Sequence, residues 1–209
     1  MIKNDTFIIA KDGTKCISVA VAVWVLMMII DADLLSFIAF AAVLATLWAY
    51  RNPERVTPYQ QEDSIVSVAD GIIKSIETLE GEEHFKVSIK TGFLDTSILR
   101  APFDGIVKES VCVAGARLSG NTALSTKLNE QSHVTFINGE KEIEVNHNLQ
   151  RANVNIVNPL ERGDEIKQGG RYGLMVQGES SMILPANSRV SVKVGQRVRA
   201  GETLIGFFS

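Results

Sequence analysis

The sequence predicts a mainly β protein: an N-terminal transmembrane helical hairpin followed by a single all-β soluble domain of the sandwich or hammerhead type. Two observations lead to this fold class. Two uncharged apolar runs, residues 17–30 and 34–50, stand near the N-terminus. After residue 60, short β-branched runs recur between turn signals, and no long helical period is present. At 209 residues, the chain has room for a membrane anchor and one soluble domain of about 150 residues.

The two apolar runs contain fourteen and seventeen residues, slightly short for spanning helices of about 17 to 25 residues. Lysines precede the first run, Arg51 and Arg55 follow the second, and Asp31 and Asp33 lie between them. By the positive-inside rule, this pattern favours a hairpin with both outer ends in the cytoplasm. We therefore expect the protein at the membrane, with its β domain on the cytoplasmic side. A helical hairpin buried in a soluble core is the alternative, whereas the small-residue cleavage site of a signal peptide is lacking.

Composition divides the chain into four segments. A polar N-terminal segment covers residues 1–15, and the membrane hairpin covers residues 16–50. A proline-punctuated linker covers residues 51–63, where neither a helix interior nor a central strand is expected. The β domain covers residues 64–209. Its strand-like runs are 64–68, 71–76, 85–89, 105–113, 133–137, 141–145, 154–157 and 189–194.

Two segments near the C-terminus, residues 163–169 and 195–201, share the pattern G-[D/Q]-x-[I/V]-x-x-G. Each unit predicts a turn, a short strand with one core residue, and a second turn. Paired units of this kind are typical of hammerhead and lipoyl-carrier folds, in which two related halves pack together. No lysine lies in a lipoyl or biotin attachment motif, so a carrier function is not predicted.

Charge and histidine spacing argue against other function classes. The formal net charge of -3 provides no basic field for nucleic acid, and we expect no nucleic-acid partner. His84, His133 and His147 are scattered without HxxxH or HExxH spacing, so no metal site is predicted. His133 starts an apolar run and His147 lies in a polar turn between Asn146 and Asn148, positions typical of structural or surface histidines.

Four segments, in the same order, resemble the phosphatidylserine decarboxylase family, particularly its short forms. RNPERVTP at residues 51–58 is similar to the family's RDPxRxxP, and SVADG at residues 67–71 is similar to its SPADG. RAPFDGIV at residues 100–107 resembles NRAPxxGxV, and VGQRVRAGET at residues 194–203 resembles VxxGQxVxAGET. The resemblance extends from about residue 50 to the C-terminus.

The resemblance implies a membrane-anchored protein of phospholipid biosynthesis that converts phosphatidylserine to phosphatidylethanolamine and CO2. Family members cut their own chain before a serine, whose remains become a pyruvoyl group that serves as the electron sink while CO2 leaves. An aspartate, a histidine and the serine supply base, relay and nucleophile. Membrane phospholipid is the expected partner, while a protein partner and a homo-oligomer are left open.

The family's functional positions carry over only in part. Asp70 stands at the position of the family aspartate, and Arg100 is the candidate to hold the lipid phosphate or carboxylate. Ser97 stands where the family has its histidine, and a serine cannot act as a base near pH 7. At the family's Gly-Ser junction, Gly178 is followed by Glu179, and the segment beyond is one residue shorter.

Apolar strand-like runs end at Val176 and resume at Met182, enclosing a polar turn for which three interpretations stay open. In the first interpretation, the cut is displaced, so that Ser180 or Ser181 is the pyruvoyl precursor and the protein is a carboxy-lyase. Alternatively, no cut occurs, and the protein is a catalytically silent homologue that binds lipid headgroups or a protein partner at the membrane. In the third interpretation, the segment is only a surface turn.

Overall fold

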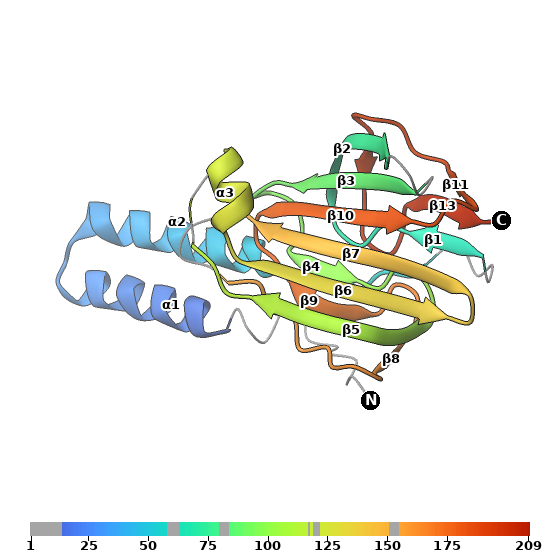
Figure 1. The fold of residues 1–209 in the computed structure, drawn as a ribbon. Helices are drawn as coiled ribbons and strands as arrows, with labels where there is room; N and C mark the ends of the chain where they lie inside the picture. Colours follow the sequence, from blue (N-terminus) through green and yellow to red (C-terminus); the bar gives the residue numbers. More distant parts are fainter. Residues whose placement is uncertain (1–13, 58–62, 80–83, 117, 119–121, 151–154) are drawn as a thin grey trace. The chain divides into compact units, whose positions relative to one another are not determined.

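The computed structural model describes residues 14–57, 63–79, 84–116, 118, 122–150 and 155–209. The chain divides into two compact units, a helical one that ends at Glu54 and a β-rich one that runs from Arg55 to Ser209 (Figure 1). Most of the predicted N-terminal segment, residues 1–13, lies outside the described residues, as do residues 58–62 of the predicted linker.

The helical unit is a pair of consecutive helices, α1 (Thr14–Ile29) and α2 (Asp33–Ala49). Neither contains glycine or proline, so nothing in either apolar run breaks the helix. The chain leaves α1 through a Schellman motif, in which the amide of Ala32 donates to the carbonyl oxygen of Met27 at 3.2 Å. Asp31 takes the left-handed φ of 51° that this motif requires, a conformation that aspartate tolerates better than most residues.

The prediction of a transmembrane hairpin is wrong. Among the residues that the structure describes, no helix is long and apolar enough to cross a membrane. With 16 and 17 residues at 1.5 Å each, α1 and α2 extend about 24 to 26 Å, against about 30 Å for the hydrocarbon core of a bilayer. The acidic tip sets this limit, because Asp31 lies in the turn after the first helix and Asp33 begins the second.

The described part of the β-rich unit contains thirteen strands and one short helix, α3 (Ala123–Leu128). The strands are β1 (Ser64–Val66), β2 (Gly71–Thr78), β3 (Phe85–Thr91), β4 (Ile98–Arg100), β5 (Gly105–Val113), β6 (Gln131–Asn138), β7 (Lys141–Leu149), β8 (Glu165–Ile166), β9 (Arg171–Leu174), β10 (Gly178–Leu184), β11 (Ser188–Val190), β12 (Arg197–Val198) and β13 (Leu204–Phe208). Eight strands form one antiparallel sheet in the order β12-β2-β3-β10-β7-β6-β5-β8. Two smaller sheets have the orders β1-β13-β11 and β4-β9.

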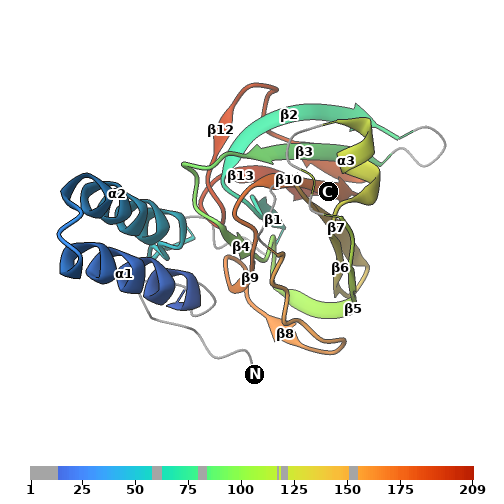
Figure 2. The same ribbon diagram turned by 90° about the vertical axis from the view of Figure 1, so that its left-hand side faces the viewer.

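The large sheet is strongly curved, and Figure 2 shows β1, β4 and β9 on its concave side. The pairing register shifts between Ile73 and Ser75 on β2 and between Val107 and Glu109 on β5. Such bulges increase the local bend and twist of a strand, which helps the sheet close around its core. The concave face and the small sheets together enclose the core, whose largest fully buried side chains include Ile89, Leu99, Phe103, Phe136, Ile143, Met175 and Met182.

The predicted glycine-bounded repeat is confirmed, and its two copies form the two edges of the large sheet. One copy contains β8 and the other β12, and both are flanked by glycines with positive φ. Their registers are equivalent, since Ile166 lies opposite Gly105 and Val198 lies opposite Gly71. The order of the strands is therefore symmetric about the pairing of β10 with β7, with β2 and β3 corresponding to β5 and β6.

The main difference from the predicted strands concerns residues 178–181. These residues form the first half of β10, a central strand, and not a polar turn between two strands. Burial alternates along the whole strand, with Ser180 facing inward and Glu179 and Ser181 facing outward. A sheet tolerates these polar residues because alternate side chains point to opposite faces. The interpretation of this segment as a surface turn is therefore wrong.

Smaller differences lie elsewhere in the β-rich unit. His147, expected in a polar turn, lies within β7. In the predicted run 154–157, residue 154 is outside the described residues and Val157 forms only an isolated bridge with Leu174. The helix α3 was not expected, because six residues are too few for a helical period; a capping box between Thr122 and Ser125 begins it.

Candidate active site at one end of the large sheet

Three segments singled out in the sequence meet at one end of the large sheet. Asp70 directly precedes β2, Ser97 directly precedes β4, and Gly178 begins β10. Thr91, the last residue of β3, pairs with Gly178 and donates its hydroxyl to the carbonyl oxygen of Asp70 at 2.7 Å. The amide of Met175, just before β10, donates to the carbonyl oxygen of Ser97 at 2.8 Å. The fold thus brings together three segments that are far apart in the sequence.

The carboxylate of Asp70 is buried and held from several sides. Arg55 donates to both of its oxygens, with Nη2 2.7 Å from Oδ2, and the amide of Ala200 donates to Oδ1 at 2.8 Å. Burial by itself would raise the pKa of Asp70, but the hydrogen bond and charge of Arg55, with the bonds from Ala200 and Thr96, lower it below its usual value. At neutral pH, Asp70 is therefore an ionised carboxylate paired with Arg55.

Asp104 makes the same kind of hydrogen bond as Asp70, which indicates that this bond has a structural role in the fold. Asp104 precedes β5 as Asp70 precedes β2, and its Oδ1 accepts a hydrogen bond from the amide of Gln168 at 2.6 Å. Gln168 and Ala200 occupy the same position in the two repeat copies, so both aspartates tie a strand to a sheet edge. Among the described contacts, the ion pair with Arg55 distinguishes Asp70. Arg55 comes from the predicted linker, in the segment that resembles the family's RDPxRxxP, and the sequence did not indicate that it pairs with Asp70.

Ser180 forms part of a buried chain of polar side chains. His147 on β7 lies directly opposite Ser180 in the β7–β10 pairing. Its Nδ1 is 2.8 Å from Ser180 Oγ, and its Nε2 is 2.6 Å from the hydroxyl of Tyr172 on β9. The exposed fractions of Ser180, His147 and Tyr172 are 0%, 1% and 2%. Ser181, the other candidate, is half-buried on the outer face.

The three buried side chains Ser180, His147 and Tyr172 are all uncharged at physiological pH. Burial, with a contribution from the charge of His133, lowers the pKa of His147 from 6.5 to about 3. One ring nitrogen of His147 therefore carries a hydrogen and the other a lone pair. Burial raises the pKa of Tyr172, so its hydroxyl keeps its proton. A neutral imidazole beside a serine hydroxyl is an arrangement that can activate the hydroxyl as a nucleophile.

Glu179 stands where the family has its serine, and it faces the outer side of the sheet. Its Oε2 is 2.6 Å from Nζ of Lys74 on β2 and 3.4 Å from Nε2 of Gln150. The residue before it must be glycine, because a Cβ on Gly178 would collide with the backbone carbonyl oxygen of Asn148 and would also lie 2.6 Å from the sulfur of Met175. The backbone around the Glu179-Ser180 bond is therefore held by packing on one side and by an ion pair on the other.

Arg100 is only 5% exposed, and its Nη1 donates to the carbonyl oxygen of Gly169 at 2.8 Å. Gly201 lies close to the Arg100 stem, because a Cβ there would be 2.9 Å from Cδ. Both glycines end a copy of the repeat, so Arg100 lies where the two copies meet. Ser97 is also buried. The structure brings Ser97 and Asp70 to the same end of the sheet, whereas the guanidinium of Arg100 donates to the end of one repeat copy.

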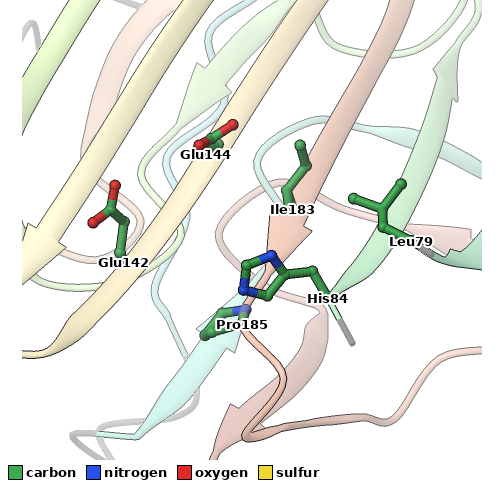
Figure 3. A pocket seen from close by; sticks show the side chains of 6 residues that line it. All are labelled: Leu79, His84, Glu142, Glu144, Ile183 and Pro185. Atoms are coloured by element: carbon green, nitrogen blue, oxygen red, sulfur yellow. The ribbon is translucent and has the colours of Figure 1, made fainter. Parts of the chain in front are cut away.

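A pocket of about 400 Å³ lies on the outer face, near the opposite end of β10 (Figure 3). Ile183 lines this pocket, whereas Ser180 faces the concave side, so the pocket and the Ser180–His147–Tyr172 chain lie on opposite faces of the sheet. We therefore place the candidate site at Ser180. The pocket is lined by Leu79, His84, Glu142, Glu144, Ile183 and Pro185.

Sequence reasoning identified Ser180 but missed its partners His147 and Tyr172. The signal for His147 was present in the alternation of residues 141–149, where Ile143, Val145 and His147 fall on the same face and are all buried. A histidine on the apolar face of a strand needs a polar partner inside the protein. No pattern in the sequence indicated that the partner would be Ser180.

Replacing Arg55 by Met should destabilise the protein strongly, because the carboxylate of Asp70 would remain buried without its cation. We expect a loss of about 3 to 5 kcal/mol in the free energy of unfolding, measured by urea denaturation. Lys108→Met is the matched control. It removes an exposed ion pair with Glu142, and should cost about 1 kcal/mol or less. Equal losses in the two variants would contradict this role for Arg55.

His147 should make stability depend on pH. Between pH 6.5 and about 3, the unfolded chain binds a proton on this imidazole that the folded protein does not bind. The free energy of unfolding should therefore fall as the pH is lowered through this range, by about 1.4 kcal/mol per unit where the difference is complete. Urea denaturation at several pH values would show a smaller slope in His147→Gln than in His133→Gln. Indistinguishable slopes would mean that His147 is not buried in its neutral form.

Comparisons with known proteins cover almost the whole chain. The family model described as "Phosphatidylserine decarboxylase" matches residues 43–206. The phosphatidylserine decarboxylase proenzyme of Desulfotalea psychrophila is 31% identical over 206 residues, with 95% of each chain covered. The corresponding proenzyme of Chlorobium phaeobacteroides is 34% identical, over 79% of this chain and 80% of its own. No solved structure matches significantly. This chain therefore belongs to the phosphatidylserine decarboxylase family.

Proposed function

We propose that this protein decarboxylates the serine headgroup of a membrane phospholipid, converting phosphatidylserine to phosphatidylethanolamine and CO2. The observation that best supports this proposal is that the segments of Asp70, Ser97 and Gly178 meet at one end of the large sheet. The resemblance assigned a functional residue to each of these segments. Relatives that match nearly the full chain are phosphatidylserine decarboxylase proenzymes, which supports the same reaction here.

The proposal requires a pyruvoyl group made from Ser180 or Ser181. When present, such a group supplies a carbonyl that withdraws electrons from the substrate as CO2 leaves. The described residues fit its precursor, because the hydroxyl of Ser180 is hydrogen-bonded to a neutral imidazole within a buried strand. The Arg55–Asp70 ion pair holds the start of β2, and the carbonyl oxygen of Asp70 accepts a hydrogen bond from Thr91 of β3, the neighbour of β10. The role of this ion pair is to position the site and not to transfer protons.

We further propose that the helical unit binds the surface of a phospholipid membrane without crossing it, with the β-rich unit on the cytoplasmic side. Large apolar side chains of both helices are exposed, including Val19 at 64% and Phe37 at 71%. At one end of α2, the guanidinium of Arg51 lies 4.1 Å from the ring centroid of Trp48, a pairing suited to the boundary between lipid and water. A phospholipid surface would cover this apolar area, and it would also present the substrate.

A second function is favoured by a specific observation and is kept as the alternative. Asp70 is neutralised by Arg55, and Glu179 stands at the family's serine position, paired with Lys74. A homologue built in this way could bind lipid headgroups or a protein partner without cutting its own chain. The two functions differ in whether the purified protein is one piece or two.

Self-cleavage is tested by intact mass and by CO2 release from vesicles that contain phosphatidylserine. We expect two fragments, the smaller one starting at residue 180 or 181, and conversion of the lipid to phosphatidylethanolamine. The variant with both Ser180→Ala and Ser181→Ala is the control, and it should stay uncut and inactive. A folded wild-type protein that gives a single mass of 22.8 kDa and releases no CO2 would overturn the decarboxylase and leave the alternative.

Membrane binding is tested by flotation with phospholipid vesicles. Val19→Glu combined with Phe37→Glu should reduce the fraction of protein that floats, because charges on the apolar surface oppose its burial in lipid. Val194→Glu is the control, since Val194 is an exposed apolar residue of the β-rich unit. An equal floating fraction for all three proteins would count against the helical unit as the membrane-binding element.

A further inference from the structure

We propose that the chain is cut between Glu179 and Ser180, and that His147 is the base that accepts the proton of the Ser180 hydroxyl. This inference rests on the proposed function and deepens it. It assigns the precursor role to Ser180 and excludes Ser181. It also names a catalytic residue at a position where neither the family pattern nor the sequence analysis placed one.

The two faces of β10 distinguish the two candidate serines. Ser180 faces the concave side, where the imidazole of His147 is 2.8 Å from its Oγ. Ser181 faces the outer side, and among the described residues its hydroxyl makes no hydrogen bond to a titratable side chain. A hydroxyl needs a proton acceptor within hydrogen-bond reach to become a nucleophile. Of the two candidate serines, Ser180 meets that condition.

The imidazole is fixed at both ring nitrogens. Nε2 of His147 is 2.6 Å from the hydroxyl of Tyr172, and the Tyr172 ring packs edge-on against Phe136 with centroids 5.5 Å apart. The ring of His147 therefore cannot turn away from Ser180 without breaking a buried hydrogen bond. When Nε2 carries the hydrogen and donates it to Tyr172, Nδ1 has a free lone pair directed at Ser180 Oγ.

The family's usual positions cannot supply this base. Ser97 replaces the family histidine and has no basic group, and Asp70 is occupied by Arg55. His147 enters from another strand, β7, directly opposite Ser180. Both the serine and the histidine of the site are thus displaced from the family pattern, and the displaced residues contact each other. This coincidence is the strongest evidence that the pair has a function beyond packing.

The reaction is balanced without an oxidant or reductant. Ser180 Oγ bonds to the carbonyl carbon of Glu179, and its proton passes through His147 to the Ser180 nitrogen as the peptide bond breaks. The resulting ester is then eliminated, with loss of the Cα proton of residue 180, so that Glu179 leaves as a carboxylate and residue 180 becomes an amino-substituted alkene. That alkene takes up a proton at its methylene carbon, one water replaces the nitrogen, ammonia leaves, and a pyruvoyl carbonyl remains.

Burial suits the first of these steps. Ser180 is fully buried, so water has little access to the ester formed there. Elimination can then proceed before hydrolysis, which would only return a serine. On the outer face, at Ser181, an ester would be exposed to solvent and would more readily be hydrolysed.

The experiment follows cleavage in freshly folded full-length protein by mass spectrometry, with and without hydroxylamine, which traps an ester as a hydroxamate. Wild-type protein should give a hydroxamate at Glu179 when trapped. Without hydroxylamine, it should give a C-terminal fragment, residues 180–209, that is lighter by one ammonia than a fragment starting with serine.

His147→Gln should slow cleavage at least about 100-fold, because Gln fills a similar volume but cannot accept the proton. Ser180→Cys should still form the trappable ester analogue, because a thiol can take the same place.

Matched controls separate this role from packing. His133→Gln changes a histidine on the neighbouring strand, and Met182→Leu changes the next inward side chain of β10. Both should cleave within about threefold of the wild-type rate, since neither touches Ser180 Oγ. Ser181→Ala should also be cut at the same bond.

The possible outcomes are distinct. A fragment that starts at residue 181, or wild-type-like cleavage in folded His147→Gln, would overturn this assignment while leaving self-cleavage and the proposed decarboxylase intact. A folded wild-type protein that is neither cut nor trapped by hydroxylamine would overturn the proposed function itself. Cleavage at residue 180 that is lost in His147→Gln and kept in the controls would establish the assignment.

Discussion

The pairing of β7 with β10 is the interaction on which the rest of the structure depends. It lies at the centre of the large sheet and joins two halves with equivalent strands and equivalent edges. Its register places Ser180 opposite His147 on the concave face. A shift of β10 by one residue would turn Ser180 toward the outer face, away from His147, and would also move the buried Met182 and Leu184 out of the core. The apolar core of the sheet and the geometry of the site are therefore set by the same register.

The approximate symmetry separates what supports the fold from what is specific to the site. Asp70 and Asp104 make the same hydrogen bond to a sheet edge, so an aspartate is needed at both places for structural reasons. The guanidinium of Arg55 adds a charge on one side only. Ser180 and His147 add a buried polar contact at the centre of the sheet, where the two halves meet.

Local patterns in the sequence were enough for most of the strands, the glycine-bounded repeat and the two helices, because each depends on neighbours within a few residues. They failed at residues 178–181, where glycine, glutamate and serine suggested a turn. Turn composition is a local preference, and the sheet overrides it when each polar side chain finds a partner. Lys74 pairs with Glu179, and His147 pairs with Ser180. The prediction of a membrane-spanning hairpin was wrong for a different reason. The helices end at the acidic turn, and each is too short to cross a membrane.

The sequence by itself determined the family, the mainly β architecture and Ser180 as one of two candidates, because these follow from motif order, from alternation and from residue identity. Only the tertiary structure decided that Asp70 forms an ion pair with Arg55 and that Ser181 faces the outer side of the sheet. It also decided that His147 contacts both Ser180 and Tyr172 in the core. The physical reason is that these contacts link side chains on different strands. Their distances depend on strand order and register across the whole sheet, which no short stretch of sequence specifies.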